Sequence, residues 1–235
     1  MKYEDFAALA AKGSIAVDGL AGIENVTSYP FENKKKPGFA RRHFRMVKRC
    51  SDIVLCIALL PVMVICALGL LIANPFANRG PLFFVQPRMG RNCEPFNAIK
   101  FRSMKPAKVI ERRADCPVEA DRITRLGHFI RKTRIDELPQ IINVLRGEMS
   151  LIGPRPDYYD HACHFLENVP GYRERHLVLP GISGLAQTEV GYVQGTDATR
   201  RKVQADLHYI NHSGFRLEAW IFMRTFAVVF GRKGV

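Results

Sequence analysis

The sequence lacks most of the short motifs that mark familiar enzyme classes. It contains no Gly-x-x-x-x-Gly-Lys-Ser/Thr loop, no Gly-x-Gly-x-x-Gly turn, no His-Glu-x-x-His and no Asp-x-Asp. These absences argue against a P-loop nucleotide site, a Rossmann dinucleotide site and a zincin protease. The missing Asp-x-Asp is a metal-binding motif that is common in nucleotide-sugar glycosyltransferases. The sequence has no internal repeat and no long low-complexity tract either.

Cysteines in metal-ligand or disulfide-framework spacing are also lacking. No two of the cysteines form a Cys-x-x-Cys pair, which argues against a zinc ribbon and a secreted disulfide scaffold and favours a reducing compartment. His161, Cys163 and His164 are clustered, but no second ligand pair stands at a suitable spacing, so packing near a helix is the favoured interpretation over a metal site. The six cysteines are Cys50, Cys56, Cys66, Cys93, Cys116 and Cys163.

Acidic residues are scarce relative to basic ones. The 235 residues include 35 Lys and Arg against 22 Asp and Glu, a formal net charge of +13. A hydrophobic share of 47% excludes a chain that is disordered throughout, and the length allows one or two domains. The excess of positive charge predicts an anionic partner, which is nucleic acid, a phosphorylated substrate or a lipid surface.

The first 33 residues differ from the rest in charge. They carry five acids and two lysines, and many small and turn-forming residues follow residue 12. We expect residues 1–33 to form a mobile tail with one short helix at residues 3–12.

A basic cluster adjoins a long apolar run in residues 34–76. Residues 34–49 hold eight basic side chains and no acid, and residues 53–73 carry no charge. This pattern is typical of a juxtamembrane segment that faces anionic lipid, where each cation contributes about 1 kcal/mol. The run is long enough to cross a bilayer, at roughly 31 Å. Basic residues on both flanks and Pro61 in its middle nevertheless favour a helix that enters and returns, with a kinked spanning helix as the alternative.

Residues 77–235 have the pattern of a small α+β domain. Two β-rich runs at residues 81–86 and 95–101 flank a basic turn with Gly90, which predicts a hairpin. Residues 122–132 and 136–146 are predicted to be helices. The amphipathic segment 215–230 is either an interfacial helix or a core helix. We therefore expect a helix-dominated α+β fold with a hairpin and amphipathic helices at the membrane interface.

Asp136 and Glu137 are the sharpest chemical feature. Pro139 places them in the first turn of a predicted helix, where the partial positive charge keeps acids ionised and attracts phosphate. Arg131 precedes them closely. An ionised carboxylate in positive surroundings suits a nucleophile that attacks a phosphoanhydride, and a second carboxylate can hold Mg²⁺. Ordinary capping by acids in the first helical turn is the competing explanation.

Four short segments place this pair in a wider context. Residues 100–104 are Lys-Phe-Arg-Ser-Met, residues 150–156 are Ser-Leu-Ile-Gly-Pro-Arg-Pro, and residues 180–184 are Pro-Gly-Ile-Ser-Gly, with residues 131–140 around the acid pair. Together with the basic, apolar N-terminal segment, this order resembles the bacterial sugar transferases. More narrowly, it is similar to the monotopic polyprenol-phosphate phosphoglycosyl transferases that begin exopolysaccharide synthesis. The resemblance covers roughly residues 45–230.

The resemblance implies a reaction. A UDP-sugar and polyprenol (undecaprenyl) phosphate would give polyprenol-diphospho-sugar and UMP in a ping-pong sequence with a covalent aspartyl-phosphosugar. Asp136 would be the nucleophile, and Glu137, with Asp136, would bind Mg²⁺. Glucose or galactose is the sugar expected from family habit. Further residues that match the family motifs would bind phosphates or substrate, namely Lys100, Arg102, Arg131, Arg155 and, at a late acidic position, Asp206.

The resemblance also implies a location. The family's membrane helix re-enters after a Ser-Pro step, so the chain is expected in the bacterial inner membrane, with residues 34–76 as a re-entrant helix broken at Pro61. Residues 77–235 would then form a catalytic domain on the cytoplasmic face, with a homo-oligomer left open. Leu60 replaces the family's serine, and Arg134 stands where Ser or Thr is common, so that Thr133 is expected to cap the helix instead. A basic membrane-associated regulator or nucleic-acid-binding protein without catalysis is the alternative; nucleic acid is the least favoured partner.

Overall fold

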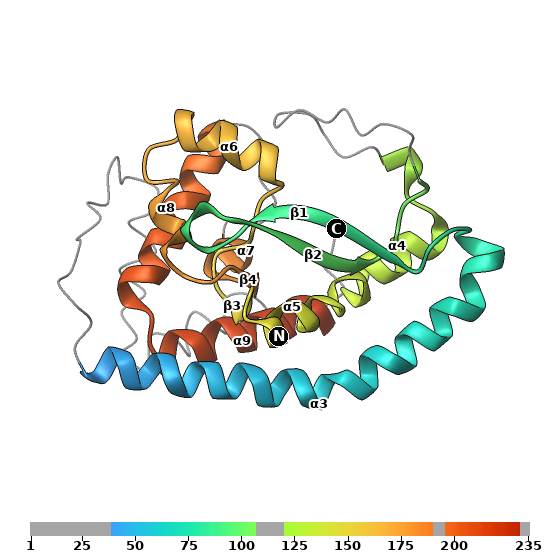
Figure 1. Cartoon of the computed structure of the whole chain (residues 1–235), viewed down its shortest axis with the longest axis horizontal. Helices are drawn as coiled ribbons and strands as arrows, with labels where there is room; N and C mark the ends of the chain where they lie inside the picture. Colours follow the sequence, from blue (N-terminus) through green and yellow to red (C-terminus); the bar gives the residue numbers. More distant parts are fainter. Residues whose placement is uncertain (1–38, 107–119, 190–195, 231–235) are drawn as a thin grey trace, which may run out of the picture. The chain divides into compact units, whose positions relative to one another are not determined.

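The long helix α3 (Phe39–Ala77) dominates one side of the described chain (Figure 1). The computed structural model describes residues 39–106, 120–189 and 196–230. The predicted tail at residues 1–33 and the first cations of the basic cluster lie outside these residues. All of the described residues belong to one compact unit, residues 31–235. Between Arg42 and Ala77, α3 is long and apolar enough to cross a membrane, with most of its apolar stretch unburied.

Pro61 lies inside α3 without interrupting it. The helix continues through Pro61 and Pro75, and the second half of its ribbon turns upward in Figure 1. A proline inside a helix removes one backbone hydrogen bond and clashes with the preceding turn. Packing against neighbouring elements can keep such a helix continuous. The break predicted at Pro61 is therefore wrong for the described helix, which is continuous from Phe39 to Ala77.

The predicted hairpin is confirmed. Strands β1 (Phe83–Met89) and β2 (Pro95–Phe101) pair antiparallel, with Phe83 opposite Phe101. The 3₁₀ turn η2 (Arg91–Cys93) joins them, and Gly90 donates its N–H to the carbonyl of Glu94 at 2.7 Å. A second, parallel pair, β3 (Ser150–Ile152) with β4 (Gly181–Ser183), escaped prediction because each strand has only three residues.

The helix predicted at residues 122–132 begins at Arg125, after Thr124 accepts a hydrogen bond from Gly127 N–H at 2.9 Å. The helix predicted at residues 136–146 is in fact two elements, η4 (Ile135–Glu137) and α5 (Gln140–Arg146). Pro139 has no N–H for the bond that would join them. The expected Thr133 cap is wrong, because Thr133 ends α4 and donates its hydroxyl to the Phe129 carbonyl at 2.9 Å.

The remaining helices surround the β3–β4 pair and the hairpin. They are η3 (Ala120–Arg122), α4 (Arg125–Lys132), α6 (Tyr159–Asn168), η5 (Glu174–Leu177), α7 (Leu185–Glu189), α8 (Thr196–His212) and α9 (Phe215–Phe230). The helix predicted at residues 215–230 is present as α9, with one side in the core and another side exposed. Ile221 is fully buried in the core, whereas Met223 and Phe226 on the same helix are 67% and 43% exposed.

One face of α3 packs on the rest of the unit, and α5 lies between α3 and strand β2 (Figure 1). In the first half of α3, Cys56 is buried against Ile141 and Val144 of α5. In the second half, Leu70 is buried against Phe101 of β2 and Ile130 of α4. The other face is apolar and exposed, including Ile57, Ile65, Leu68, Leu71, Ile72 and Phe76.

Candidate active site

Asp136 and Glu137 form the centre of the candidate active site. Both lie in the 3₁₀ turn η4 between α4 and α5, and both are buried, at 8% and 6% exposure. Arg134, directly before the turn, has a left-handed backbone with φ of 60°. This conformation reverses the chain after α4 and turns the acid pair inward.

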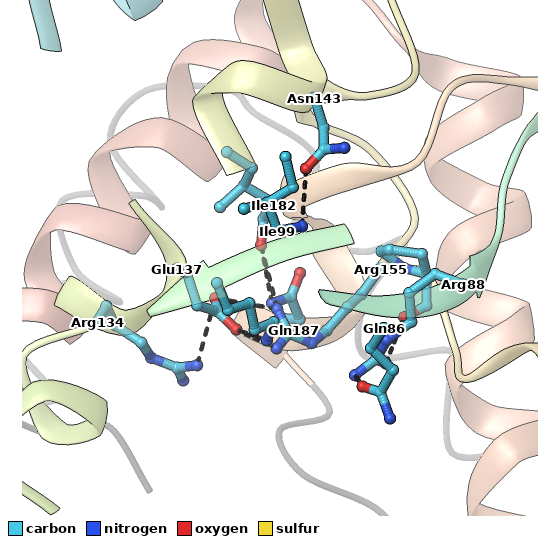
Figure 2. Close-up of polar contacts among 11 residues, drawn as sticks. Gln86, Arg88, Ile99, Arg134, Glu137, Asn143, Arg155, Ile182 and Gln187 are labelled. Carbon is cyan, nitrogen blue, oxygen red and sulfur yellow. Dashed lines mark hydrogen bonds and ion pairs between the residues drawn. The ribbon is translucent and has the colours of Figure 1, made fainter. Parts of the chain in front are cut away.

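Basic groups from three segments surround Glu137 (Figure 2). Lys100 of β2 donates from Nζ to Oε1 at 2.8 Å, and Arg155, after β3, donates from Nη1 to Oε2 at 3.1 Å and from Nη2 to Oε1. Arg134 is more distant, with Nη1 3.8 Å from Oε2. Burial would raise the pKa of Glu137, but Arg155 and Lys100 hold it well below its usual value. Glu137 is therefore an anion at neutral pH.

Asp136 has the opposite electrostatic setting. Burial and the adjacent negative charge of Glu137 raise its pKa, while Lys100, Arg131 and Arg155 oppose that rise. Its Oδ1 atom is buried and has no hydrogen-bond partner. Burial of a carboxylate oxygen without a protein partner is costly, and such atoms are found at reactive and ligand-binding groups.

Lys100 is held in an unusual state by the same cluster. Burial lowers its pKa to about 8, despite the partial compensation by Glu137, and the charges of Arg155 and Arg88 lower it further. Arg88 of β1 also donates to the carbonyl of Pro156 at 3.0 Å, which ties the hairpin to the Arg155 segment (Figure 2).

The backbone around Arg155 is held by close packing of the β3 and β4 segments. Gly153 N–H donates to the Ser183 carbonyl at 2.8 Å, and Gly181 N–H donates to the Pro154 carbonyl at 2.9 Å. A Cβ atom at Gly181 would lie 2.1 Å from the Gly153 nitrogen, so only glycine permits this approach. The motifs at residues 150–156 and 180–184 thus build a single support for Arg155.

A cavity of about 310 Å³ adjoins the acid pair and includes Glu137 in its wall. Its lining is mostly apolar and comes from α3, η4, α5, β3, β4, α7 and α9. The apolar lining residues are Leu59, Ile135, Leu138, Ile141, Leu151, Ile182 and Phe226. A larger cavity of about 600 Å³ lies at the C-terminal end of α3, and the acid pair is not part of its lining.

Comparison with known proteins shows the family to which this chain belongs. Residues 43–232 match the family model described as bacterial sugar transferase. The chain belongs to the bacterial sugar transferase family. The family prediction from the sequence motifs is therefore confirmed.

Characterised family members give the relationship more detail. The chain is 38% identical over 187 residues to the UDP-N-acetylgalactosamine-undecaprenyl-phosphate N-acetylgalactosaminephosphotransferase of Aeromonas hydrophila, covering 79% of this chain and 44% of that protein. It is 39% identical over 173 residues to the UDP-glucose:undecaprenyl-phosphate glucose-1-phosphate transferase of Escherichia coli K12, covering 71% and 36%. It is 34% identical over 194 residues to the exopolysaccharide production protein PSS of Rhizobium leguminosarum, covering 77% and 93%. The chain thus spans less than half of the first two relatives.

Two residues predicted from the sugar transferase motifs lie away from Glu137. Arg102 is buried against backbone carbonyls where α3 ends, donating from Nε to Pro81 at 2.8 Å and from Nη2 to Asn78. Asp206 of α8 is 1% exposed and accepts a hydrogen bond from Nε of Arg175 at 2.8 Å. The placement of Arg102 points to a structural role, because its donors are directed at carbonyls rather than at a cavity.

Asp206 nevertheless acts on the site through Arg175. The fully buried Arg175 donates to the carbonyl of Arg155 at 2.7 Å and to Asp157 at 2.6 Å. Lys202 donates to the other oxygen of Asp157 at 2.5 Å. Burial would lower the pKa of Arg175, but Asp206 and Asp157 raise it, so its charge is secure. This network fixes the backbone of Arg155 from behind.

The sequence motifs singled out Asp206, but sequence reasoning missed the other members of this network. Asp157 directly follows the Pro-Arg-Pro segment, which is a signal that could have drawn attention to it. Arg175 gives no such signal, because it is one of 35 basic residues and its partners come from distant segments. Asn143 of α5 was also missed. Its side chain accepts a hydrogen bond from Ile99 N–H at 3.0 Å (Figure 2) and donates one to the Asn97 carbonyl at 2.7 Å. These two bonds fix β2 beside the acid pair.

The donor set for the predicted Mg²⁺ is small. Among the described residues, no three His, Cys, Asp or Glu side chains are grouped as a metal site. Mg²⁺ commonly uses one or two carboxylates and completes its shell with water and substrate phosphates. The unpartnered Oδ1 of Asp136 fits this habit, whereas both oxygens of Glu137 already bind basic groups. The residues therefore fit an ion held largely by a diphosphate substrate.

Proposed function

We propose that this chain transfers a sugar 1-phosphate from a UDP-sugar to polyprenol phosphate, giving polyprenol-diphospho-sugar and UMP. The unpartnered Oδ1 of the buried Asp136, beside the basic groups that surround Glu137, is the observation that carries the proposal. The names of the relatives support the substrate classes, because they specify UDP-sugars and undecaprenyl phosphate. A regulator without catalysis would have no use for this costly arrangement.

The charge balance of the site suits a diphosphate. Four cations (Lys100, Arg131, Arg134 and Arg155) surround or neighbour the two carboxylates, which leaves a surplus of two positive charges. Such a surplus attracts an anionic substrate and lets a carboxylate approach a phosphorus atom despite their like charges. Arginine suits this task because its planar guanidinium binds phosphate oxygens in pairs.

The proposed reaction has two displacements at the same phosphorus. A carboxylate oxygen of Asp136 attacks the sugar-bearing phosphorus; the new O–P bond forms as the bond to the α-phosphate oxygen breaks, and UMP leaves with that electron pair. An oxygen of the polyprenol phosphate then attacks the aspartyl-phosphosugar, forming the diphosphate and releasing the Asp136 carboxylate. Neither step requires a proton transfer. Mg²⁺ would screen the negative charge of the diphosphate; Asp136 has an open oxygen for it, whereas Glu137 would have to exchange a contact with Lys100 or Arg155 to bind it.

The setting of the reaction is also part of the proposal. We infer that α3 re-enters the bacterial inner membrane and that the catalytic unit faces the cytoplasm, where UDP-sugars are available. The name of the Rhizobium relative supports a role in exopolysaccharide production. The names of the relatives specify different sugars. Measuring UMP release from UDP-glucose, UDP-galactose and UDP-N-acetylgalactosamine would identify the sugar that this chain transfers.

Replacing Asp136 with Asn tests the nucleophile. The variant keeps the size of the side chain and removes its negative charge, so we expect UMP release from every UDP-sugar to fall at least a thousandfold. Intact-protein mass spectrometry after incubation with UDP-sugar alone should show a sugar-phosphate adduct on the wild-type chain and none on Asp136→Asn. Retained turnover in the variant would refute the assignment. The same assay with a metal chelator tests the need for Mg²⁺.

A further inference from the structure

The cavity beside Glu137 has a lining that suits a lipid chain better than a nucleotide. Its apolar side chains come from α3, α5, α9 and the β3–β4 pair. Its polar lining groups mostly bond within the protein: Thr133 to Phe129, Thr188 to Leu185, and Ser183 to Thr225. Oε1 of Gln187 is an exception, since it is buried without a partner. A uracil base or ribose would find few open hydrogen-bonding groups here.

We propose that this cavity binds the phosphate-proximal part of a prenyl phosphate, with Arg134 binding the phosphate. This inference rests on the proposed function, because it assigns the acceptor of that reaction to a position in the fold. The committed ligand is an isoprenoid phosphate rather than a bulk phospholipid. Arg134 and Glu137 both line the cavity, so the phosphate would lie next to the acid pair.

Arg134 is bound less closely to Glu137 than Lys100 and Arg155 are. Its Nη1 lies 3.8 Å from Oε2, beyond hydrogen-bond distance, whereas Lys100 and Arg155 form hydrogen bonds with the same carboxylate (Figure 2). Its side chain is 21% exposed, more than those of Lys100 and Arg155 at 16% and 18%. Arg134 also lines the cavity, which places its positive charge beside an anion bound there.

The backbone of Arg134 supports a functional role. Its φ of 60° is uncommon for a residue other than glycine, asparagine or aspartate. Such a conformation in a long charged residue suggests that function rather than folding keeps arginine there. The side chain points from this turn toward Glu137 in Figure 2.

The surroundings of the cavity explain how a longer chain would fit. About 310 Å³ is at the lower end of small-molecule pockets, so only the first part of a polyprenol enters. Leu59 on α3 and Phe226 on α9 line the cavity, and both helices carry exposed apolar residues such as Ile65, Ile72 and Met223. The rest of the chain would lie along these faces in the hydrocarbon of the bilayer.

Three substitutions separate the lipid subsite from the nucleotide site. Arg134→Asn removes the charge and suits the left-handed backbone, so the variant should unfold at a temperature no lower than the wild type. Arg134→Lys keeps the charge alone. Leu59→Trp fills the cavity, and Ile57→Trp is its matched control, because Ile57 is 55% exposed on another face of α3.

Steady-state kinetics in detergent gives the first test. We expect Arg134→Asn and Leu59→Trp each to raise the KM for polyprenol phosphate by about tenfold or more, and to raise the KM for UDP-sugar by a clearly smaller factor. Arg134→Lys should recover part of the loss, and Ile57→Trp should match the wild type. The assignment would be overturned if Arg134→Asn and Leu59→Trp both left the KM for polyprenol phosphate unchanged. It would also be overturned if the KM values for the two substrates rose equally.

Direct binding gives a test that does not depend on turnover. Farnesyl phosphate should bind the wild-type chain and raise its unfolding temperature, and Arg134→Asn and Leu59→Trp should each reduce that binding. Farnesol, inorganic phosphate and phosphatidic acid should bind much more weakly; equal binding of phosphatidic acid would overturn the isoprenoid assignment. If no UDP-sugar yields UMP while farnesyl phosphate still binds through Arg134 and Leu59, the proposed function fails and the subsite stands.

Discussion

Glu137 organises the acid pair at the scale of single residues. Its carboxylate binds Lys100 of β2 and Arg155, which follows β3, and burial together with the negative charge of Glu137 raises the pKa of Asp136. Because Lys100 and Arg155 bond to Glu137, Oδ1 of Asp136 is left without a hydrogen-bond partner. The pair has two unequal members, one enclosed by basic groups and one with an unpartnered oxygen, as a nucleophile and its partner require.

The pKa of Lys100 makes a prediction about pH. A lysine is charged below its pKa and neutral above it, so with a pKa of about 8 Lys100 loses its charge in mildly alkaline solution. The site would then lose one positive charge and one partner of Glu137. We expect kcat/KM for UDP-sugar to fall as the pH rises past about 8. Lys100→Arg should shift this fall upward by more than about one pH unit, because arginine stays charged.

The matched control for this profile is Lys105→Arg, at an exposed position shortly after Lys100. Its pH profile should superpose on that of the wild type. An identical alkaline limb in Lys100→Arg and the wild type would show that another group causes the fall in activity.

For single residues, only the order of the motifs predicted that one site contains Asp136, Glu137, Lys100 and Arg155. Charge and spacing alone left ordinary helix capping open. They also could not separate Arg155 from Arg102, since both follow short β-rich segments. The difference depends on which carbonyls lie nearby in three dimensions, and Arg102 meets those of Asn78 and Pro81.

At the scale of elements, α3 is attached to the rest of the unit by polar contacts as well as apolar packing. Lys48 pairs with Glu218 of α9 at 2.6 Å, and Arg49 donates to the Leu145 carbonyl in the last turn of α5 at 3.4 Å. The basic cluster was assigned wholly to lipid head groups, and these two cations show that part of it holds the helix in place. Arg42 and Arg45 remain exposed, as a contact with anionic lipid needs.

The contact between Asp52 and Ser150 predicts a stability effect. Ser150 Oγ at the start of β3 donates to Asp52 Oδ2 at 2.7 Å, and Asp52 is 5% exposed. Asp52→Ala should lower the free energy of unfolding by about 1–3 kcal/mol, because it removes a buried charged acceptor. Asp52→Asn should lose less, since its carbonyl oxygen still accepts. Thermal unfolding in detergent measures both, with the exposed Ser51→Ala as control; unchanged stability in Asp52→Ala would contradict the prediction.

Elements with a strong local signal were predictable and those fixed by tertiary contacts were not. The hairpin follows from two β-rich runs and a glycine turn, and it is confirmed. The division of the predicted helix 136–146 into η4 and α5 depends on the left-handed Arg134, which no propensity indicates for arginine. The β3–β4 pair depends on glycines at residues 153 and 181 whose backbones touch only after folding.

At the scale of the whole described unit, both halves of α3 bind the same body. Its first half is held by α5 and α9 through Cys56 and Lys48, and its second half by β2 and α4 through Leu70. Just after its end, Asn78 donates to the Arg102 carbonyl at 2.7 Å. A helix that crossed the bilayer would place about 30 Å of hydrocarbon between its ends. Anchors on one body at both ends therefore support the proposed re-entry.

Labelling both ends of α3 tests this topology. With Cys50 replaced by Ser, single cysteines at Arg42 and Arg91, both exposed, report the two sides of the helix. We expect a membrane-impermeant maleimide to label both positions in inverted inner-membrane vesicles and neither in intact cells with a permeabilised outer membrane. The parent without either new cysteine gives the background. Because the apolar run is long enough to cross a membrane, composition alone allows either topology. Labelling of one position from each side of the membrane would establish a spanning helix. The two ends of α3 would then lack the common cytoplasmic face on which the proposed site depends.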